Sequence, residues 1–276
     1  MNKLILNLAP TGIVPTKKST PNVPIFPKEI IDDVIKCSNL GVSMVHVHAR
    51  DINGNPTYKK EIYEEIFNGI RSVNSDIILI ASTSGRNFPD ISNRSEVLFL
   101  EDKLKPDMAS LTLSSMNFLR NASINSPDNI IKLASIMNER GIKPELEVFD
   151  LGMINYSKYL IKKGILKPPY YFNIFLGNIS SAQANLSHLG LLISELPENS
   201  YFSITGIGEF QHSMTALSTI IADGVRIGIE DNIWYDKEDG ILATNENLVK
   251  RIINIASAYN REVASPLEVR DMLNIK

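Results

Sequence analysis

Short apolar stretches alternate with longer segments of helical periodicity along the whole chain. The apolar stretches predict strands that are buried on both faces, because they lack the alternation of a half-exposed strand. The intervening segments repeat their apolar residues at the spacing of one helix face. The predicted strands are 4–8, 44–48, 77–81, 108–111, 145–149, 172–175, 202–205 and 225–229. The predicted helices are 28–40, 59–73, 93–103, 127–140, 153–163, 182–196, 211–223, 245–259 and 266–273.

Regular alternation of strands and helices predicts parallel βαβ units. Eight such units in a chain of 276 residues favour a closed barrel. An open doubly wound sheet would need a glycine-rich phosphate turn after its first strand, and the turn at residues 9–12 lacks that spacing. We therefore expect an α/β protein, a (β/α)8 TIM barrel formed by residues 1–276 as a single domain with a C-terminal helical extension. The Pro-rich segment 10–27 is expected to be a loop over the barrel mouth.

Composition narrows the class of protein without identifying a partner. The net charge of -3 gives no reason to expect nucleic acid. Cys37 is the single cysteine, so no intramolecular disulfide can form. No apolar run approaches the roughly 18 residues that cross a bilayer. These features predict a cytoplasmic protein that works on small molecules and has no membrane partner.

The second predicted strand ends in two histidines, His46 and His48. Residues two apart on a strand face the same side, so both imidazoles are expected to point together. In a barrel enzyme the carboxyl ends of the strands carry the active site. A lone histidine in an apolar strand is more often a core residue, but a pair at this position favours a shared metal ion.

The last predicted strand leads into Glu230 and Asp231. Strand eight of a closed barrel neighbours strand one, which neighbours strand two, so Glu230 can approach the histidine pair. Two histidines and a carboxylate form the usual ligand set of a catalytic Zn²⁺ or Fe²⁺ site. Glu230 has the alternative of pairing with Arg226 or Arg50, and Asp231 is equally compatible with a general base and a helix N-cap.

Other strand ends also carry polar residues. The third strand leads into Ser82 and Gly85, the fourth carries Ser110, and in the fifth Glu145 and Glu147 share one face. Hydroxyl groups and a glycine turn at a barrel mouth can bind a carboxylate, although ordinary turn chemistry also explains each of them. Gly206 and Gly208 precede a predicted helix and are weak evidence for a phosphate site.

Taken together, these stretches resemble the β-keto acid cleavage enzymes, whose known type is the 3-keto-5-aminohexanoate cleavage enzyme of lysine fermentation. The resemblance covers essentially the whole chain. It is carried by the segments 9–12, 45–50, 144–148, 206–208 and 226–232.

The resemblance implies a Zn²⁺-dependent barrel, usually a homotetramer, that exchanges carbon fragments between a β-keto acid and acetyl-CoA. The products are acetoacetate and a new acyl-CoA. The roles it implies are zinc ligation by His46, His48 and Glu230, catalysis by Asp231, Arg226 and Glu147, and substrate binding by Ser82, Gly85, Ser110 and Thr11.

The first loop departs from the aminohexanoate enzyme, which has a glutamate for the substrate amine where this chain has Val14. Valine cannot pair with an ammonium group, so we expect a keto acid with a neutral or apolar tail. Lys17 and Lys18 in the same loop offer an alternative contact to a second carboxylate or to the phosphates of coenzyme A.

Two other functions are compatible with the residues. A metal-dependent barrel aldolase or hydrolase would use the same ligands without coenzyme A, and acetyl-CoA dependence separates it from the first hypothesis. A non-catalytic barrel protein with a decayed site is disfavoured by the intact set of His46, His48, Glu230 and Asp231.

Overall fold

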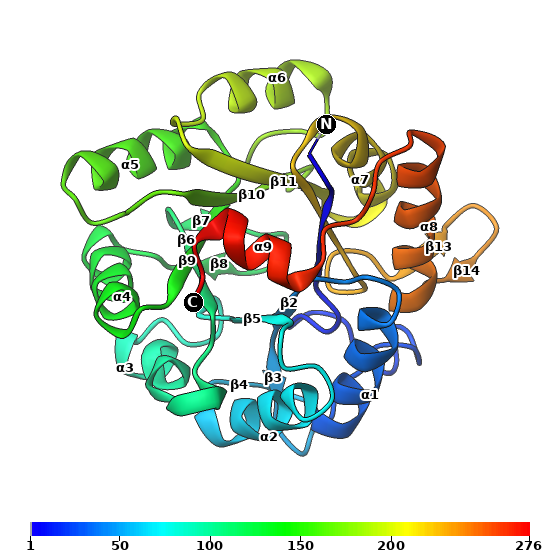
Figure 1. Ribbon diagram of the computed structural model, residues 1–276, viewed down its shortest axis with the longest axis horizontal. Helices are drawn as coiled ribbons and strands as arrows, with labels where there is room; N and C mark the ends of the chain where they lie inside the picture. Colours follow the sequence, from blue (N-terminus) through cyan, green and yellow to red (C-terminus); the bar gives the residue numbers. More distant parts are fainter. Residues whose placement is uncertain (1) are drawn as a thin grey trace.

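The computed structural model describes residues 2–276, so that Met1 of the predicted domain lies outside the described residues. Within this range eight parallel strands close into a barrel in the order β1-β12-β11-β10-β9-β6-β5-β2 (Figure 1). The predicted (β/α)8 barrel is confirmed. The barrel strands are β1 (Ile5–Leu8), β2 (Met44–Val47), β5 (Ile78–Ala81), β6 (Met108–Thr112), β9 (Lys143–Val148), β10 (Tyr170–Leu176), β11 (Ser200–Gly206) and β12 (Gly224–Ile227).

Side chains along each strand point alternately outward, into an apolar layer under the helices, and inward, into the barrel lumen. The lumen changes from apolar to polar along the barrel axis. Leu6 and Leu8 of β1 belong to the main core under the helices, whereas Ile5 belongs to a second cluster. Asn7, one step above Ile5 on the same face, is also fully buried but polar. The lumen is therefore apolar at the amino-terminal end of the strands and polar toward their carboxyl ends, where buried polar groups need partners.

The helices surround the barrel (Figure 1). Their bounds are α1 (Pro27–Ser38), α2 (Lys60–Arg71), α3 (Ile91–Ser95), α4 (Pro127–Arg140), α5 (Leu151–Lys162), α6 (Leu186–Ser194), α7 (Gln211–Ile221), α8 (Asn245–Ala258) and α9 (Pro266–Leu273). Short 3₁₀ turns occur at η1 (Glu96–Phe99), η2 (Asp102–Leu104) and η3 (Gly208–Phe210).

Two predicted helices differ from the observed ones. The predicted helix 93–103 is wrong in extent, because the backbone is extended at Leu100 (ψ 147°) and Asp102 has a positive φ of 50°. That region forms α3, η1 and η2 instead. The predicted helix 182–196 begins only at Leu186, because the Asn185 side chain accepts a hydrogen bond from the His188 amide and caps the helix there.

Short antiparallel hairpins extend from the carboxyl ends of the barrel strands. They are β3 (Ala49–Arg50) with β4 (Pro56–Thr57), β7 (Met116–Asn117) with β8 (Ala122–Ser123), and β13 (Trp234–Asp236) with β14 (Ile241–Leu242). They follow β2, β6 and β12 and therefore build the rim of the mouth. The sequence pattern did not predict them, because strands of two or three residues carry no periodicity.

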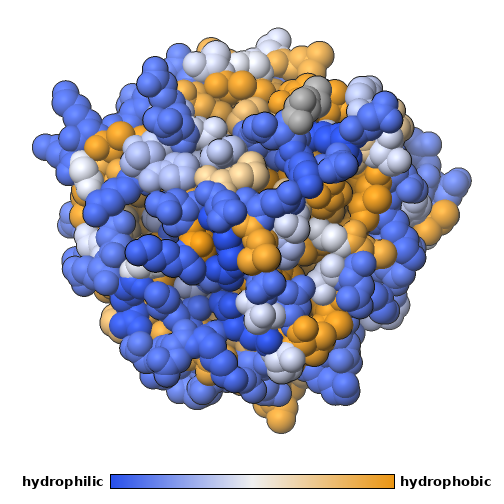
Figure 2. Space-filling view, viewed as in Figure 1, coloured by the Kyte–Doolittle hydropathy of each residue, from blue (hydrophilic) through white to orange (hydrophobic). Residues whose placement is uncertain are grey.

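Helix α9 covers the amino-terminal end of the barrel, in front of the strands in Figure 1. Its Val269 and Leu273 pack with Ile5, and Arg270 forms an ion pair with Asp107 at 2.9 Å. Figure 2 shows that hydrophilic residues cover most of the surface on this side. The functional end of the barrel is the opposite one. Among the described residues, no helix combines the length and apolar character needed to cross a membrane.

Lys143, at the start of β9, allows a test of how burial of a charge at the amino-terminal end of the barrel affects stability. Its ammonium donates a hydrogen bond to the Pro169 carbonyl at 2.8 Å, and burial lowers its pKa from 10.5 to about 8. Between these values the unfolded chain binds more protons than the folded protein, so the free energy of unfolding should rise with pH. We expect this rise to be smaller in Lys143→Met. Urea denaturation of both proteins at pH 8 and pH 10 measures it, and equal rises would exclude a contribution from Lys143.

Candidate active site

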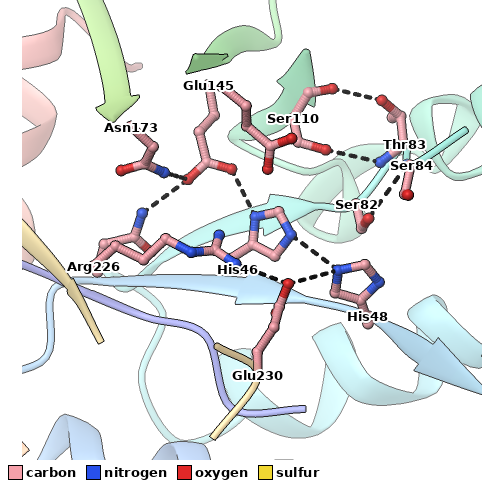
Figure 3. Close-up of polar contacts among 12 residues, drawn as sticks. His46, His48, Ser82, Thr83, Ser84, Ser110, Glu145, Asn173, Arg226 and Glu230 are labelled. Carbon is pink, nitrogen blue, oxygen red and sulfur yellow. Dashed lines mark hydrogen bonds and ion pairs between the residues drawn. The ribbon is translucent and has the colours of Figure 1, made fainter. Parts of the chain in front are cut away.

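The polar lumen brings together side chains from opposite ends of the sequence (Figure 3). His46 lies on β2, while Arg226 lies on β12 and Glu230 follows it. Both strands pair with β1, where Asn7 is in register with Arg226 on one side and with Met44 on the other. The expected neighbour relation of strands eight, one and two is confirmed, and it places Glu230 beside the histidines.

His46, His48 and Glu230 present their ligand atoms to one point, within 4.8 Å of one another. The two Nε2 atoms are 3.3 Å apart, and His48 Nε2 is 3.2 Å from Glu230 Oε1. Burial lowers the pKa of His48, which favours the neutral imidazole that binds metals. Glu230 Oε2 is buried and has no hydrogen-bond partner in residues 2–276. An unpaired carboxylate oxygen beside two imidazoles fits a divalent cation.

The alternative partners of Glu230 are resolved by the contacts. Arg226 Nη2 lies 2.8 Å from Glu230 Oε1, so this ion pair is present. The Arg50 guanidinium instead donates to the carbonyl groups of Gly12, Pro15 and Gly54. Pairing with Arg226 uses one oxygen of Glu230 and leaves the other available, so ion pairing and metal ligation are compatible.

Gly12 of the first loop packs directly against Glu230. Its backbone has φ +62°, and an added Cβ would lie 2.5 Å from Glu230 Cγ. A side chain at this position would displace the carboxylate, and the left-handed backbone also favours glycine. The Thr-Gly pair of the first loop therefore has a structural role next to the candidate metal ligands.

Asp231 accepts a hydrogen bond from Arg226 Nε at 3.0 Å. The helix N-cap interpretation is wrong, because the chain continues into the β13–β14 hairpin rather than a helix. Burial raises the pKa of the Asp231 carboxyl even though Arg226 opposes this change. By contrast, the neighbouring His48 and Arg226 side chains outweigh burial and hold the pKa of Glu230 well below its usual range. Adjacent carboxylates with opposite shifts are typical of groups with different roles.

Glu145 supports His46 from behind. One carboxylate oxygen accepts from His46 Nδ1 at 2.6 Å, and the other accepts from the amides of Asn7 (2.8 Å) and Asn173 (2.6 Å). All four side chains are at most 1% exposed. A proton held on Nδ1 leaves Nε2 of His46 free to face His48 and Glu230. Carboxylates in this position fix the orientation and basicity of a metal-binding imidazole.

We therefore expect Glu145→Gln to bind metal about 10- to 100-fold more weakly, because a neutral amide supports the imidazole less well. Titration of the metal-free protein with Zn²⁺ against a competing chelator measures the change. Glu147→Gln is the matched control, since Glu147 lies two residues along the same strand but bonds Thr112 at 2.6 Å instead of His46. Equal affinities for the wild type and Glu145→Gln would contradict this role.

Glu147 and Asp231 line a cavity of about 610 Å³ at the mouth, together with His48, Arg226 and Glu230. Burial raises the pKa of Glu147. His46 and Glu145 also form a possible ligand set with Glu147. The set that contains Glu230 is the better candidate, because Glu145 already accepts three hydrogen bonds. The apolar part of the wall consists of Ile13, Val14, Phe118, Leu119, Phe149, Phe175 and Ile207.

The predicted substrate-binding residues differ in whether they lie on the wall of a cavity. Ser82 lines a small cavity next to His48. The Ser110 hydroxyl is 2% exposed and accepts from the Thr83 amide at 3.0 Å. Gly85 permits the close approach of the Ile124 carbonyl and the Arg94 guanidinium, which a side chain would block. Thr11 is fully buried, and its hydroxyl has no partner in the described residues. Of these four residues, Ser82 alone lines either of the two cavities beside His48 that residues 2–276 form.

Gly206 and Gly208 have local structural functions. The Gly208 amide donates to the Asp231 carbonyl at 2.7 Å, and an added Cβ on Gly206 would collide with the Phe210 carbonyl. The amide is therefore not available to a phosphate, and the weak phosphate interpretation finds no support. Gly208 instead holds the loop that carries Asp231.

The sequence analysis missed Asn7 and Asn173, which hold Glu145. A signal was present, because an amide inside an otherwise apolar strand marks a polar lumen position. Arg86, which follows Gly85, was also not predicted to have a role, and its position on the cavity wall depends on the β7–β8 hairpin.

Comparison with known proteins identifies a family that matches almost the whole chain. A family model described as beta-keto acid cleavage enzyme matches residues 3–275. The chain is 36% identical over 279 residues to the 3-keto-5-aminohexanoate cleavage enzyme of Fusobacterium nucleatum subsp. nucleatum, covering 100% of this chain and 99% of that protein. It is 29% identical over 274 residues to the 3-oxoadipate:acetyl-CoA acetyltransferase of Cupriavidus necator, covering 98% and 94%.

Among solved structures, the apo structure of ObcA superposes with a TM-score of 0.82 at 18% identity. The match covers 92% of this chain and 66% of that longer chain. At this identity the likeness supports the barrel fold alone.

Proposed function

Because this chain belongs to the β-keto acid cleavage enzyme family, we propose that it exchanges carbon fragments between a β-keto acid and acetyl-CoA. A substrate R–CO–CH₂–COO⁻ and acetyl-CoA would give acetoacetate and R–CO–CoA. One observation carries the proposal: two members of the triad, His48 and Glu230, line the same cavity as a carboxylate, Asp231, that is held by Arg226. The name of the relative from Cupriavidus necator, 3-oxoadipate:acetyl-CoA acetyltransferase, supports acetyl-CoA as the second substrate.

His46, His48 and Glu230 would hold one Zn²⁺ per chain, as two imidazoles and a carboxylate with buried, converging ligand atoms suit this cation. When bound, Zn²⁺ supplies Lewis-acid chemistry that favours negative charge on a keto oxygen. Glu145 would keep His46 in the tautomer that presents Nε2.

Asp231 would remove the proton from the carbon between the keto and carboxylate groups. Its raised pKa makes it a stronger base than an ordinary aspartate, and the hydrogen bond from Arg226 Nε fixes its direction. Glu147 would face the substrate from the other side of the lumen, held by the Thr112 hydroxyl. Ser82 would bind the substrate carboxylate beside His48, and Gly85, Ser110 and Thr11 would shape the wall behind it.

The proposal extends to the assembly and its location. The homotetramer follows from the family resemblance, and the cytoplasmic location is the expectation from the sequence composition. Exposed apolar side chains on α6, such as Leu186 (71% exposed) and Leu191 (48%), offer surface for contacts between copies.

The alternative is a metal-dependent aldolase or hydrolase that uses the same ligands without coenzyme A. The test is an assay of zinc-quantified enzyme with a panel of β-keto acids, with and without acetyl-CoA, measuring acetoacetate and acyl-CoA together. Formation of both products in equal amounts, only with acetyl-CoA, is the expected result. Cleavage without acetyl-CoA would establish the alternative, and no reaction with any acid would reject the proposed reaction.

A further inference from the structure

Arg86 is a cationic side chain on the cavity wall that the proposed reaction does not use. It lies in the loop after β5, and its guanidinium carbon is 3.3 Å from the ring centroid of Phe118 in the β7–β8 hairpin. The guanidinium has no hydrogen bond or ion pair within residues 2–276, and its Nε is buried without a partner. By contrast, Arg50, Arg94 and Arg226 donate to several groups each.

This arrangement is costly unless a ligand completes it. Burial lowers the pKa of Arg86, which means that its charge is incompletely solvated, while the Glu230 and Glu147 carboxylates stabilise the charge from a distance. Stacking on Phe118 covers one face of the planar guanidinium and leaves the N–H donors at its edge free to bind a ligand. The N–H groups along the edge of the guanidinium are held in a rigid, planar arrangement that matches the two oxygens of a carboxylate.

The distribution of charge in the cavity selects against a cationic tail. Glu230 and Asp231 are engaged with Arg226, and Glu147 accepts from Thr112. Arg86 lies on the wall without an ion-pair partner among the described residues. Arg86 is thus a cation without a counter-charge in contact, whereas the two carboxylates beside Arg226 already have a cationic partner. An ammonium group would meet like charge here, whereas a carboxylate would find donors.

Apolar residues also line this cavity. Val14, at the position discussed for tail recognition, is 67% exposed, and Leu119 next to Phe118 is 76% exposed. These side chains suit a short methylene chain. A linear acid with a carboxylate at each end would meet apolar wall along its middle and a guanidinium at its far end.

We propose that Arg86 binds a second carboxylate, on the tail of the substrate, and that the substrates of this protein are β-keto dicarboxylic acids. The inference rests on the proposed function and specifies its substrate class. It refines the expectation of a neutral or apolar tail: the chain of the tail is apolar, but its end is anionic. The acyl-CoA product would then carry a free carboxylate, so the reaction that consumes it must accept a dicarboxylic acyl-CoA.

Two acids of equal length test the proposal: 3-oxoadipate, which has a tail carboxylate, and 3-oxohexanoate, which lacks it. The measured quantity is the ratio of kcat/KM for the diacid to that for the monoacid. We expect the wild type to prefer the diacid about 10- to 100-fold, the range for a hydrogen-bonded charge pair. In Arg86→Gln the ratio should fall toward one. Arg86→Lys, which keeps the charge but not the fork, should give an intermediate ratio.

Arg120→Gln is the matched control, because it removes a guanidinium from the same cavity wall at an exposed position. Its ratio should equal that of the wild type. A wild-type ratio of one or less would overturn the proposal. An equal loss for both acids in Arg86→Gln would assign Arg86 to the carboxylate common to all β-keto acids. A raised KM for acetyl-CoA with an unchanged ratio would assign it to coenzyme A, and either result overturns the proposal.

Calorimetric titration of the zinc-loaded enzyme with both acids separates this inference from the proposed function. If no acid yields acetoacetate, the proposed reaction fails. Tighter binding of 3-oxoadipate than of 3-oxohexanoate, reduced in Arg86→Gln, would still support the carboxylate site. Equal binding of the two acids would reject the carboxylate site even if acetoacetate forms.

Discussion

The His48→Ala variant is expected to lose bound zinc and acetoacetate formation together. His48 Nε2 lies 3.3 Å from His46 Nε2 and 3.2 Å from Glu230 Oε1, so its removal leaves two of three converging ligands. The Lewis-acid contribution of a catalytic metal is several kcal/mol, and each ~1.4 kcal/mol is a tenfold change in rate. We therefore expect kcat/KM to fall by at least about 10³-fold, with zinc falling from about one per chain to a small fraction.

Zinc content by atomic emission and acetoacetate formation should be measured on the same preparations. His212→Ala is the matched control, because His212 is an exposed residue of α7 outside the site. It should keep both zinc and activity. Full activity in a His48→Ala protein that has lost its zinc would reject metal dependence, and full zinc content would reject His48 as a ligand.

Asp231→Asn should lower kcat by about 10²- to 10⁴-fold, the usual contribution of a general base, while zinc content stays at the wild-type level. Asparagine at this position can still accept the hydrogen bond from Arg226 Nε, so the local geometry should persist. It cannot remove a proton from carbon. This separation of a rate effect from a metal effect distinguishes Asp231 from its neighbour Glu230.

The comparison for this prediction is Glu230→Gln, which should weaken zinc binding as well as activity, because Glu230 belongs to the candidate ligand set and its Oε2 has no partner among residues 2–276. Exchange of the substrate α-protons with deuterated water, followed by NMR, measures the proton step directly. Undiminished exchange in Asp231→Asn would assign the base to another group, and Glu147 would then be the next candidate.

The geometry also explains why adjacent carboxylates can serve different purposes. Both belong to one short turn after β12, and both contact Arg226. Glu230 points toward two imidazoles, which hold its pKa well below the usual range. Asp231 contacts only the arginine, and burial raises its pKa. Their different neighbours, not their residue types, would separate the proposed ligand from the proposed base.

The hydrophobic pattern by itself determined the barrel. All eight predicted strands are present, because strands covered by helices on one side and by the packed lumen on the other require continuous apolar runs. The order of the strands then followed from parallel βαβ connectivity. For the same reason the approach of Glu230 to His46 and His48 was predictable, since strand ends in a closed barrel have fixed neighbours.

Other features depended on contacts between residues distant in the sequence. His46 is supported by residues on three other strands, namely Glu145, Asn7 and Asn173. No local sequence pattern specifies which buried polar groups pair with one another. The burial of Ser110 and Thr11 likewise followed from the packing around them. The helix-cap interpretation of Asp231 was excluded only by the hairpin that follows it.

The position of Arg86 shows this division most clearly. Its place after β5 was readable from the sequence, but its stacking on Phe118 requires the β7–β8 hairpin, whose strands are too short to carry a periodic signal. Secondary structure follows from patterns that repeat over many residues, and the sequence specifies it directly. A substrate pocket depends on single contacts between loops, which only the tertiary structure brings together.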